Sequence, residues 1–411
     1  MKISFLSFCL LTSSVFADSF TVQSLIHKAL ATHPELRYYE AQVDAAKGGK
    51  IKAGEIKNPD LMTGVGNWRV RDLTSNDLTD GPTWAVQLTQ TFEWPGRLSL
   101  RKAIAQKDIE LAELGLQQFR AALAARVKNL CWSILAAQEK TRAADEVARR
   151  YKSLADVLLQ RDPAGIAPKL EARIIQANAL NLSATATSAR NELSNARFEL
   201  NQLLGEKAEN PVEIRGEPLT LNPPPAIETL MVEARKRNFS LRARILDVEQ
   251  QGFEVKLAEN ERWPSISVVP YIQRQQNSTR ETQLGLGISI PMPLWNRNKG
   301  AIETAKAREV QAEVMLTAQI RQLERDVAAQ VSHYRIHVEE LAKWPADTLA
   351  SFRKAAAESD EHFRLGALPL STYTELQQQY IDSVNAVLTS QVAAVEARLA
   401  LEELTGVTLN Q

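Results

Sequence analysis

The sequence has few cysteines, few aromatic residues and no excess of either charge. Its 411 residues include two cysteines, 6% aromatic residues, and 49 basic against 49 acidic residues. Cys9 lies in an N-terminal segment that we expect to be removed, so Cys131 is left alone and a disulfide framework is excluded. A nucleic-acid partner is not expected, since such proteins carry a basic excess. The abundance of Ala, Leu, Gln, Glu, Arg and Lys favours long helices over a thick globular core.

Long apolar segments are also lacking. Residues 1–17 combine Lys2, a short apolar run and the small-x-small triplet Val15-Phe16-Ala17, which is the pattern of a secretory signal peptide. That run is too short to cross a membrane, and no other approaches the length of about 18 residues that a spanning helix needs. We therefore expect a mature chain that begins near Asp18, is exported, and is either free of the membrane or part of a β-barrel.

Motifs for catalysis and for tight cofactor binding are missing as well. The sequence contains no glycine-rich phosphate loop and no nucleophile elbow. Among its five histidines, His333 and His337 have the i, i+4 spacing that places two metal ligands on one helix face. The stretch reads HYRIH and lacks the glutamate of a zinc protease. We expect no enzyme, no cofactor and no metal site, and interpret the histidine pair as part of a solvated coiled-coil face. Metal binding by the pair is the alternative.

Two stretches within an otherwise helical chain have the period of β-strands. Apolar and polar residues alternate over residues 83–92, and the pattern returns over residues 283–290. Each arm of the two expected hairpins is about ten residues long, which is the length of a tilted strand that crosses a bilayer. The apolar side of this alternation predicts six lipid-facing residues: Trp84, Val86, Leu88, Leu284, Leu286 and Ile288.

Aromatic residues near the ends of these strands fit two membrane-interface girdles. Those toward the loops are Trp68, Trp84 and Tyr271, and those toward the helices are Trp94, Trp263 and Trp295. Four strands cannot close a barrel, and an open sheet edge is not tolerated in lipid. We therefore expect three chains to pool twelve strands. The alternative is a pair of hairpins that packs on helices outside any membrane.

The rest of the chain has the periodicity of long helices. Residues 97–161 lack proline and predict one helix of about 65 residues. Breakers in the segment 161–168 predict a turn, and the returning helix is expected to end at Gly205. Apolar residues at spacings of three and four over such lengths predict coiled-coil packing.

The second half of the chain repeats the first. Gly366 lies 201 residues after Gly165, and the helix end RLALEELTG (398–406) lies 201 residues after RFELNQLLG (197–205). Such constant spacing predicts a duplication. One difference is Trp344-Pro345, which predicts a break in the second long helix and has no counterpart near residue 144. The expected domains are a signal peptide (1–17), a first repeat (18–205), a linker or equatorial segment (206–225) and a second repeat (226–411).

This twofold order of helix, two strands, long helix, turn and helix resembles the outer-membrane efflux proteins, the TolC family. The strand-to-helix junctions QTFEWPGR (90–97) and IPMPLWNRNKG (290–300) resemble those of its CzcC-like heavy-metal efflux branch. The fold implied by the resemblance is mainly α with a membrane β-barrel. Long coiled-coil helices form a duplicated repeat, and four strands per chain complete a trimeric 12-stranded barrel. The barrel would lie in the bacterial outer membrane and the helical tunnel in the periplasm.

The resemblance also implies a function and partners. The function is that of the outer-membrane exit duct of a tripartite resistance-nodulation-division (RND) efflux system that exports heavy-metal cations. The partners are the other chains of a homotrimer, a periplasmic adaptor (membrane fusion protein), an inner-membrane RND pump and outer-membrane lipid. The two helical turns become adaptor-docking tips, with the docking residues Asp162, Gly165, Arg364, Leu365 and Gly366. Alternatives are a drug-efflux or type I secretion channel and, in another class, a periplasmic coiled-coil adaptor.

Overall fold

The computed structural model describes residues 19–71, 78–160, 166–215, 221–276, 280–345 and 347–409. The expected signal peptide and the predicted tip residues Asp162 and Gly165 lie outside these ranges. The chain forms two compact units. The helical unit comprises Met1–Arg37, Gln118–Asn238 and Glu324–Gln411, and the strand unit comprises Tyr38–Gln117 and Phe239–Leu323. Each unit therefore draws on both halves of the sequence.

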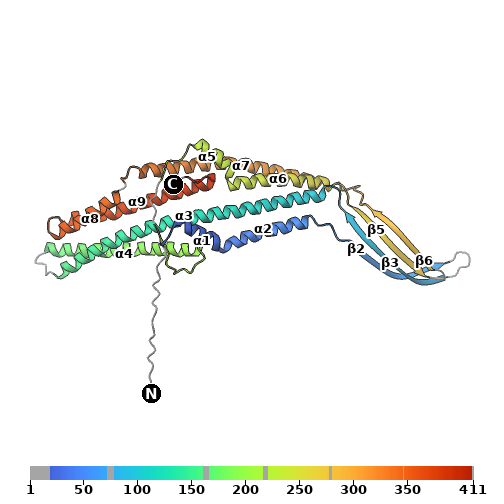
Figure 1. The fold of residues 1–411 in the computed structure, drawn as a ribbon, viewed down its shortest axis with the longest axis horizontal. Coiled ribbons are helices and arrows are strands. Elements are labelled where there is room, and N and C mark those ends of the chain that lie inside the picture. Colours follow the sequence, from blue (N-terminus) through green and yellow to red (C-terminus); the bar gives the residue numbers. More distant parts are fainter. Residues whose placement is uncertain are drawn as a thin grey trace, which may run out of the picture. The chain divides into compact units, whose positions relative to one another are not determined.

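The strand unit contains one antiparallel sheet (Figure 1). Its strands are β2 (Asp60–Arg71), β3 (Leu78–Phe92), β5 (Ile266–Gln276) and β6 (Arg280–Ser289), in the order β2-β3-β5-β6. The two predicted hairpins are β2 with β3 and β5 with β6, and the pairing of β3 with β5 joins them. Among the described residues of one chain, β2 and β6 each keep one edge without a paired strand.

Four helices connect to this sheet. α2 (Pro34–Ala53) and α6 (Phe239–Asn260) precede the hairpins, and α3 (Arg97–Gln160) and α7 (Lys299–Leu341) follow them. α3 confirms the long proline-free helix predicted from the sequence.

A cluster of hydrogen bonds holds the junction between β3 and α3. The Arg97 guanidinium donates from Nε to Asn260 Oδ1 at 3.1 Å and from Nη2 to the Trp263 carbonyl oxygen at 2.7 Å. The rings of Trp94 and Trp263 stack with their centroids 5.3 Å apart. The sequence motif QTFEWPGR thus has a structural role, since its tryptophan and arginine tie one hairpin to the helix that precedes the other.

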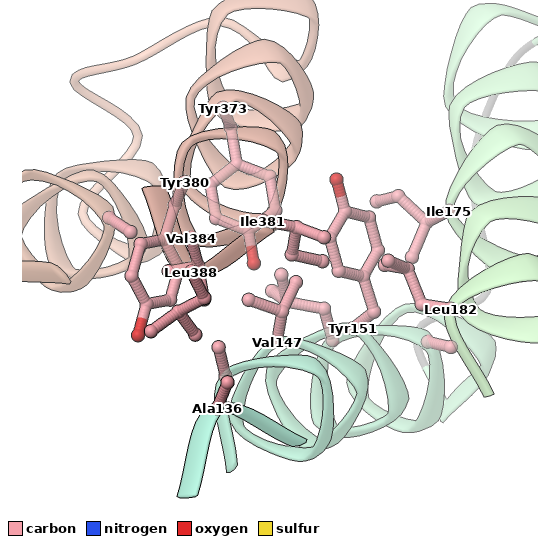
Figure 2. Close-up of a cluster of buried hydrophobic side chains, with 14 residues drawn as sticks. Ala136, Val147, Tyr151, Ile175, Leu182, Tyr373, Tyr380, Ile381, Val384 and Leu388 are labelled. Atoms are coloured by element: carbon pink, nitrogen blue, oxygen red, sulfur yellow. The ribbon is translucent and has the colours of Figure 1, made fainter. Parts of the chain in front are cut away.

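The helical unit also holds α1 (Val22–Thr32), α4 (Ile166–Leu203), α5 (Ile227–Arg237), α8 (Thr348–Arg364) and α9 (Leu370–Thr405). Two short strands, β1 (Ser19–Phe20) and β4 (Glu213–Ile214), pair in parallel and attach the segment after α4 to the start of the described chain. Buried apolar side chains of α3, α4, α8 and α9 form one core, in which Tyr151 and Tyr373 face each other with ring centroids 5.4 Å apart (Figure 2). This packing confirms the coiled-coil periodicity.

Helix ends follow the predicted breakers. Gly205 after α4 and Gly406 after α9 both have a positive φ, +68° and +64°, which a side chain with a Cβ adopts only with strain. The two positions are the equivalent landmarks of the predicted duplication. In the second half, α7 ends at Leu341 and α8 begins at Thr348, which confirms the break at Trp344-Pro345.

No helix in the described part of the chain is long and apolar enough to cross a membrane.

Candidate functional site

The six predicted lipid-facing residues lie on one face of the sheet. In an antiparallel pair, directly opposed residues share a face. Val86 is opposite Ile272, and Ile272 is opposite Leu284, so one apolar row crosses three strands. The outer strand β6 leaves Leu284, Leu286 and Ile288 exposed by 82%, 69% and 68%. We call this the apolar face.

The other side of the sheet, here called the polar face, carries many small and uncharged polar residues beside a few larger apolar and aromatic ones. Its members on the two central strands include Thr83, Gln87, Thr89, Ser267 and Gln273. Among the described strand residues of this face, the only charged side chains are Asp60 and Glu281, and both are acidic. The sequence predicts that Glu281 shares a face with Gln283, because residues two apart in a strand lie on the same side. The face of Asp60 follows only from its pairing with Thr89.

The register corrects part of the predicted aromatic girdle. Trp68 is opposite Gly81, and Tyr271 is opposite Gln87 and Gly285, so both aromatic residues belong to the polar face. Tyr271 lies directly over Gly285, where an added Cβ would come within 2.4 Å of the tyrosine ring. The loop-end girdle is therefore wrong for Trp68 and Tyr271. Of the three predicted residues, only Trp84 lies on the apolar face.

The turn between α8 and α9 has the capping geometry expected of the second tip. Gly366 has a φ of +74°, its N–H donates to the Phe363 carbonyl, and the Ala367 N–H donates to the His362 carbonyl, each at 3.0 Å. Beside it, Leu365 is 74% exposed, and Arg364 pairs with Asp360 at 2.9 Å. An apolar side chain thus stands in solvent on a turn fixed by hydrogen bonds.

A polar network lies beneath this turn, and the sequence analysis missed it. Gln377 is fully buried and donates to the Ala356 carbonyl at 2.6 Å and to Ser359 Oγ at 3.0 Å. Arg150 of α3 donates to Gln377 Oε1 at 3.0 Å and pairs with Glu146 at 2.7 Å. The network therefore joins α3 to both helices of the tip.

Two further contacts extend the same network. Arg353 of α8 reaches Glu146 of α3 at 3.1 Å, so this carboxylate is held by an arginine from each helix. Tyr373 donates to Asp360 Oδ1 at 3.2 Å, and burial, followed by the charge of Asp360, raises the pKa of Tyr373 above its ordinary range. These groups position the tip through a satisfied polar core, and they do not form a catalytic arrangement.

The histidine pair singled out in the sequence lies one turn apart on α7. His333 is exposed and His337 is half-buried on α7, and no described group of three or more His, Cys, Asp or Glu side chains could hold a metal ion. Cys131 is fully buried on α3, and burial raises the pKa of its thiol to about 12.

Comparisons with known proteins agree with this arrangement. The sequence matches the family described as outer membrane efflux protein over residues 25–206 and 230–407. It is 27% identical over 292 residues to the cobalt-zinc-cadmium resistance protein CzcC of Cupriavidus metallidurans, covering 70% of this chain and 66% of that protein. It is 25% identical over 308 residues to the outer membrane protein TolC of Salmonella enteritidis, covering 68% of this chain and 60% of that protein.

The fold is that of a solved channel. A crystal structure of CusC superposes with a TM-score of 0.72 at 15% sequence identity, over 95% of this chain and 93% of that one. The fold class is confirmed as a mainly helical chain with four antiparallel strands, and the CzcC-like branch fits. The alignments span less than two thirds of the length of the two curated relatives. Because the family match covers most of the sequence, this chain belongs to the outer membrane efflux proteins, which are channels of the outer membrane and not enzymes.

Proposed function

We propose that the protein is the outer-membrane exit duct of a tripartite efflux system and that heavy-metal cations are its cargo. The observation that carries the proposal is the sorting of the sheet into an apolar face and a polar face that has carboxylates but no described basic residue. A sheet with this sorting fits a wall with lipid on one side and water on the other.

The free edges of the sheet support assembly into a trimer. In lipid, the unpaired N–H and C=O groups along β2 and β6 would have no partner, and each would cost several kcal/mol. Pairing β6 of one chain with β2 of the next removes both edges. Three chains of four strands then close a barrel of twelve, within the size range of outer-membrane barrels.

The charge of the polar face supports cations as cargo. Asp60 and Glu281 give two carboxylates per chain and hence six in a trimer. Carboxylate rings favour cations in channels, whereas lysine or arginine would repel them. The similarity to a cobalt-zinc-cadmium resistance protein points in the same direction. Energy for transport would come from the inner-membrane RND pump, since the duct itself offers only a water-filled path.

The helical turns are the proposed adaptor-docking tips. At the second turn, Leu365 provides an exposed apolar contact and Gly366 fixes the chain direction. Arg364 is held by Asp360 beside them. The corresponding residues of the first turn, Asp162 and Gly165, lie outside the described residues and stay predictions.

A duplication is the proposed origin of the chain, with repeats at 18–205 and 226–411 joined by the linker 206–225. The left-handed glycines Gly205 and Gly406 support it, because both end their repeats at the same register and conformation. The two hairpins and the two long helices that follow them give the same order twice.

Resistance and conductance test the cargo. A strain that lacks this gene should become sensitive to cobalt, zinc and cadmium, and the wild-type gene should restore resistance. Purified trimers in planar bilayers should be cation-selective, and Asp60→Asn with Glu281→Gln should reduce that selectivity. Asp80→Asn, which removes a carboxylate from the apolar face, is the matched control. Sensitivity to drugs alone, or loss of a secreted protein, would favour the alternative channels.

Substitution at the second tip tests docking. A Cβ added at Gly366 meets no atom within 4 Å, so the main expected cost of Gly366→Val is backbone strain of about 1–2 kcal/mol. Trimer formation and membrane insertion should survive, while resistance and cysteine cross-linking between tip and adaptor should be lost. Ala367→Val is the control, because it adds a similar side chain without a positive φ. A Gly366→Val trimer that still cross-links and still confers resistance would reduce this turn to a connector.

A further inference from the structure

We propose that Arg274 and Arg280 bind phosphate groups of lipid headgroups in the membrane leaflet at the loop ends of the strands. This inference rests on the proposed barrel, because it requires the apolar face to meet lipid. It adds a binding site on the outside of the duct, separate from the path of the cargo.

The register sorts the arginines of the strands. All four described strand arginines lie on the apolar face, near the ends of the hairpins. They are Arg69, Arg71, Arg274 and Arg280. A solvated lumen would be the less costly place for a guanidinium, and the polar face has none. A charge on the lipid side is favourable only where headgroups begin.

The height of these arginines agrees with that position. The apolar band of this face runs from Phe92 to Trp84, eight residues along β3. Eight residues span about 27 Å along a strand, or about 20 Å of membrane thickness at a tilt of about 40°, close to the apolar band of about 25 Å in outer-membrane barrels. Arg274 is directly opposite Trp84, at the rim of this band, and Arg280 lies one row nearer the loop, opposite Gln276.

Two arginine sites on this face differ in their charge balance. Arg69 is neutralised by Asp80, which accepts from Nε at 2.8 Å and from Nη2 at 3.0 Å. Arg274 and Arg280 are diagonal neighbours on β5 and β6, a geometry that separates two residues by about 7–8 Å. Among the described residues of β5 and β6, no carboxylate shares their face.

The acidic residue that is close in sequence does not reach this arginine pair. Glu281 lies on the polar face and accepts from Gln275 Nε2 at 2.7 Å. The three residues between β5 and β6, Asn-Ser-Thr, carry no charge in the sequence. Two adjacent guanidinium groups without a shared anion repel each other. A phosphate relieves that repulsion and matches the planar fork of arginine, with two hydrogen bonds per group.

Native mass spectrometry of the detergent-solubilised trimer tests the site. Titration with dioleoylphosphatidylglycerol should give tighter binding than titration with dioleoylphosphatidylcholine. Arg274→Gln with Arg280→Gln should weaken phosphatidylglycerol binding by about 30-fold, since one basic residue near a membrane surface contributes about fivefold. Arg69→Gln with Asp80→Asn also replaces two residues of this face, leaves its net charge unchanged, and should keep the wild-type affinity.

Two further arms separate the possible outcomes. Replacing both arginines by lysine should retain most of the affinity, because the charge is kept. Inorganic phosphate at the same concentration should neither bind nor displace the lipid, and equal binding of free phosphate would overturn the assignment to a lipid. A wild-type trimer that inserts and conducts but shows no preference for phosphatidylglycerol refutes this inference alone. A chain that neither forms trimers nor inserts refutes the proposed function itself.

Discussion

Replacing Leu286 by arginine tests the assignment of the apolar face at its most sensitive point. Leu286 is opposite Pro270. On the neighbouring strand pair, Val86 is opposite Ile272 and Gln90 is opposite Val268. Because this register is the same on both sides of Leu88, Pro270 lies opposite Leu88. Leu88 is four residues from Trp84 and four from Phe92, the two ends of the apolar band. Leu286 therefore lies at the middle of the band.

The expected cost follows from that depth. Arginine on the lipid face costs about 2–4 kcal/mol at the bilayer midplane and about 0–1 kcal/mol near an interface. With one copy in each of three chains, Leu286→Arg should destabilise the trimer by about 6–12 kcal/mol. Leu284→Arg should cost less, because Leu284 lies two residues nearer the loop end, in the row of Val86 and Ile272.

Gln283→Arg is the matched control, since Gln283 lies on the same strand but on the polar face, opposite Gln273. It should change stability by no more than about 0.5 kcal/mol per chain. Urea titration of trimers folded into bilayers, followed by the mobility of the unheated trimer in a detergent gel, measures both. Equal damage by the two substitutions would refute the lipid-facing assignment and favour a sheet packed on both sides outside a membrane.

Three predictions concern the helical unit, and denaturant titration of the helical circular dichroism signal measures the first two. Gly406→Ala should lower the free energy of unfolding by about 2–3 kcal/mol, because the new Cβ lies 2.6 Å from Arg237 Cβ at a φ of +64°. Gly366→Ala is the control, since its Cβ has open space, and it should cost about 1 kcal/mol. Equal costs for the two substitutions would refute the clash. Glu146→Gln should lower the free energy of unfolding by about 1–3 kcal/mol, since it removes the charged partner of Arg150 and Arg353. An unchanged denaturation midpoint would show that these ion pairs do not stabilise the helical unit. Cys131 should resist alkylation at pH 8 until the protein unfolds, because its pKa is raised from 9.0 to about 12. Above pH 9 the unfolded state loses the thiol proton while the folded state keeps it. The contribution of Cys131 to the free energy of unfolding is therefore full below pH 9 and falls by about 1.4 kcal/mol per pH unit up to pH 12. Labelling of the folded protein at the rate of a free thiol would contradict this prediction.

The faces of β3 and β6 could be predicted because a strand has a period of two. In each of these strands, apolar residues occupy three successive alternate positions, so the sequence defines the face directly. β2 has no such signal, since it contains Gly64 and Gly66, and β5 contains the run Val268-Val269-Pro270. The faces of Trp68 and Tyr271 therefore follow only from pairing with a neighbouring strand. An aromatic residue near the end of a strand was not sufficient evidence of contact with lipid.

The polar network beneath the tip could not be predicted for a different reason. Gln377 begins the run Gln-Gln-Gln (377–379), and its spacing of four residues from Tyr373 and three from Tyr380 places it on the buried side of α9, unlike its exposed neighbour Gln378. Its partner Arg150 is 227 residues away, on a helix of the other half of the chain. Polar residues on long amphipathic helices are usually solvated. Helical period therefore indicates the face of Gln377 but not its partners, and only the packing of α3 against α8 and α9 reveals the pairs.

The two halves of the proposed duplication differ at a proline that interrupts one long helix. Pro345 lacks a backbone N–H and its ring clashes with the carbonyl four residues earlier, which is that of Leu341, where α7 ends. The equivalent position 201 residues earlier is Ala144, buried inside the unbroken α3. The first turn therefore follows a continuous helix of 64 residues, whereas the second follows α8, a separate helix of 17 residues.

This difference leaves α8, the helix before the second tip, separate from α7. A cavity of about 280 Å³ lies beside the break, lined by residues that include Trp344, Pro345, Val387 and Gln391, so side chains there have room to move. α8 depends instead on α9 and on the Arg353–Glu146 pair for its position. Contacts with α9 and with Glu146 of α3 therefore position Leu365 and Gly366, which follow directly after α8.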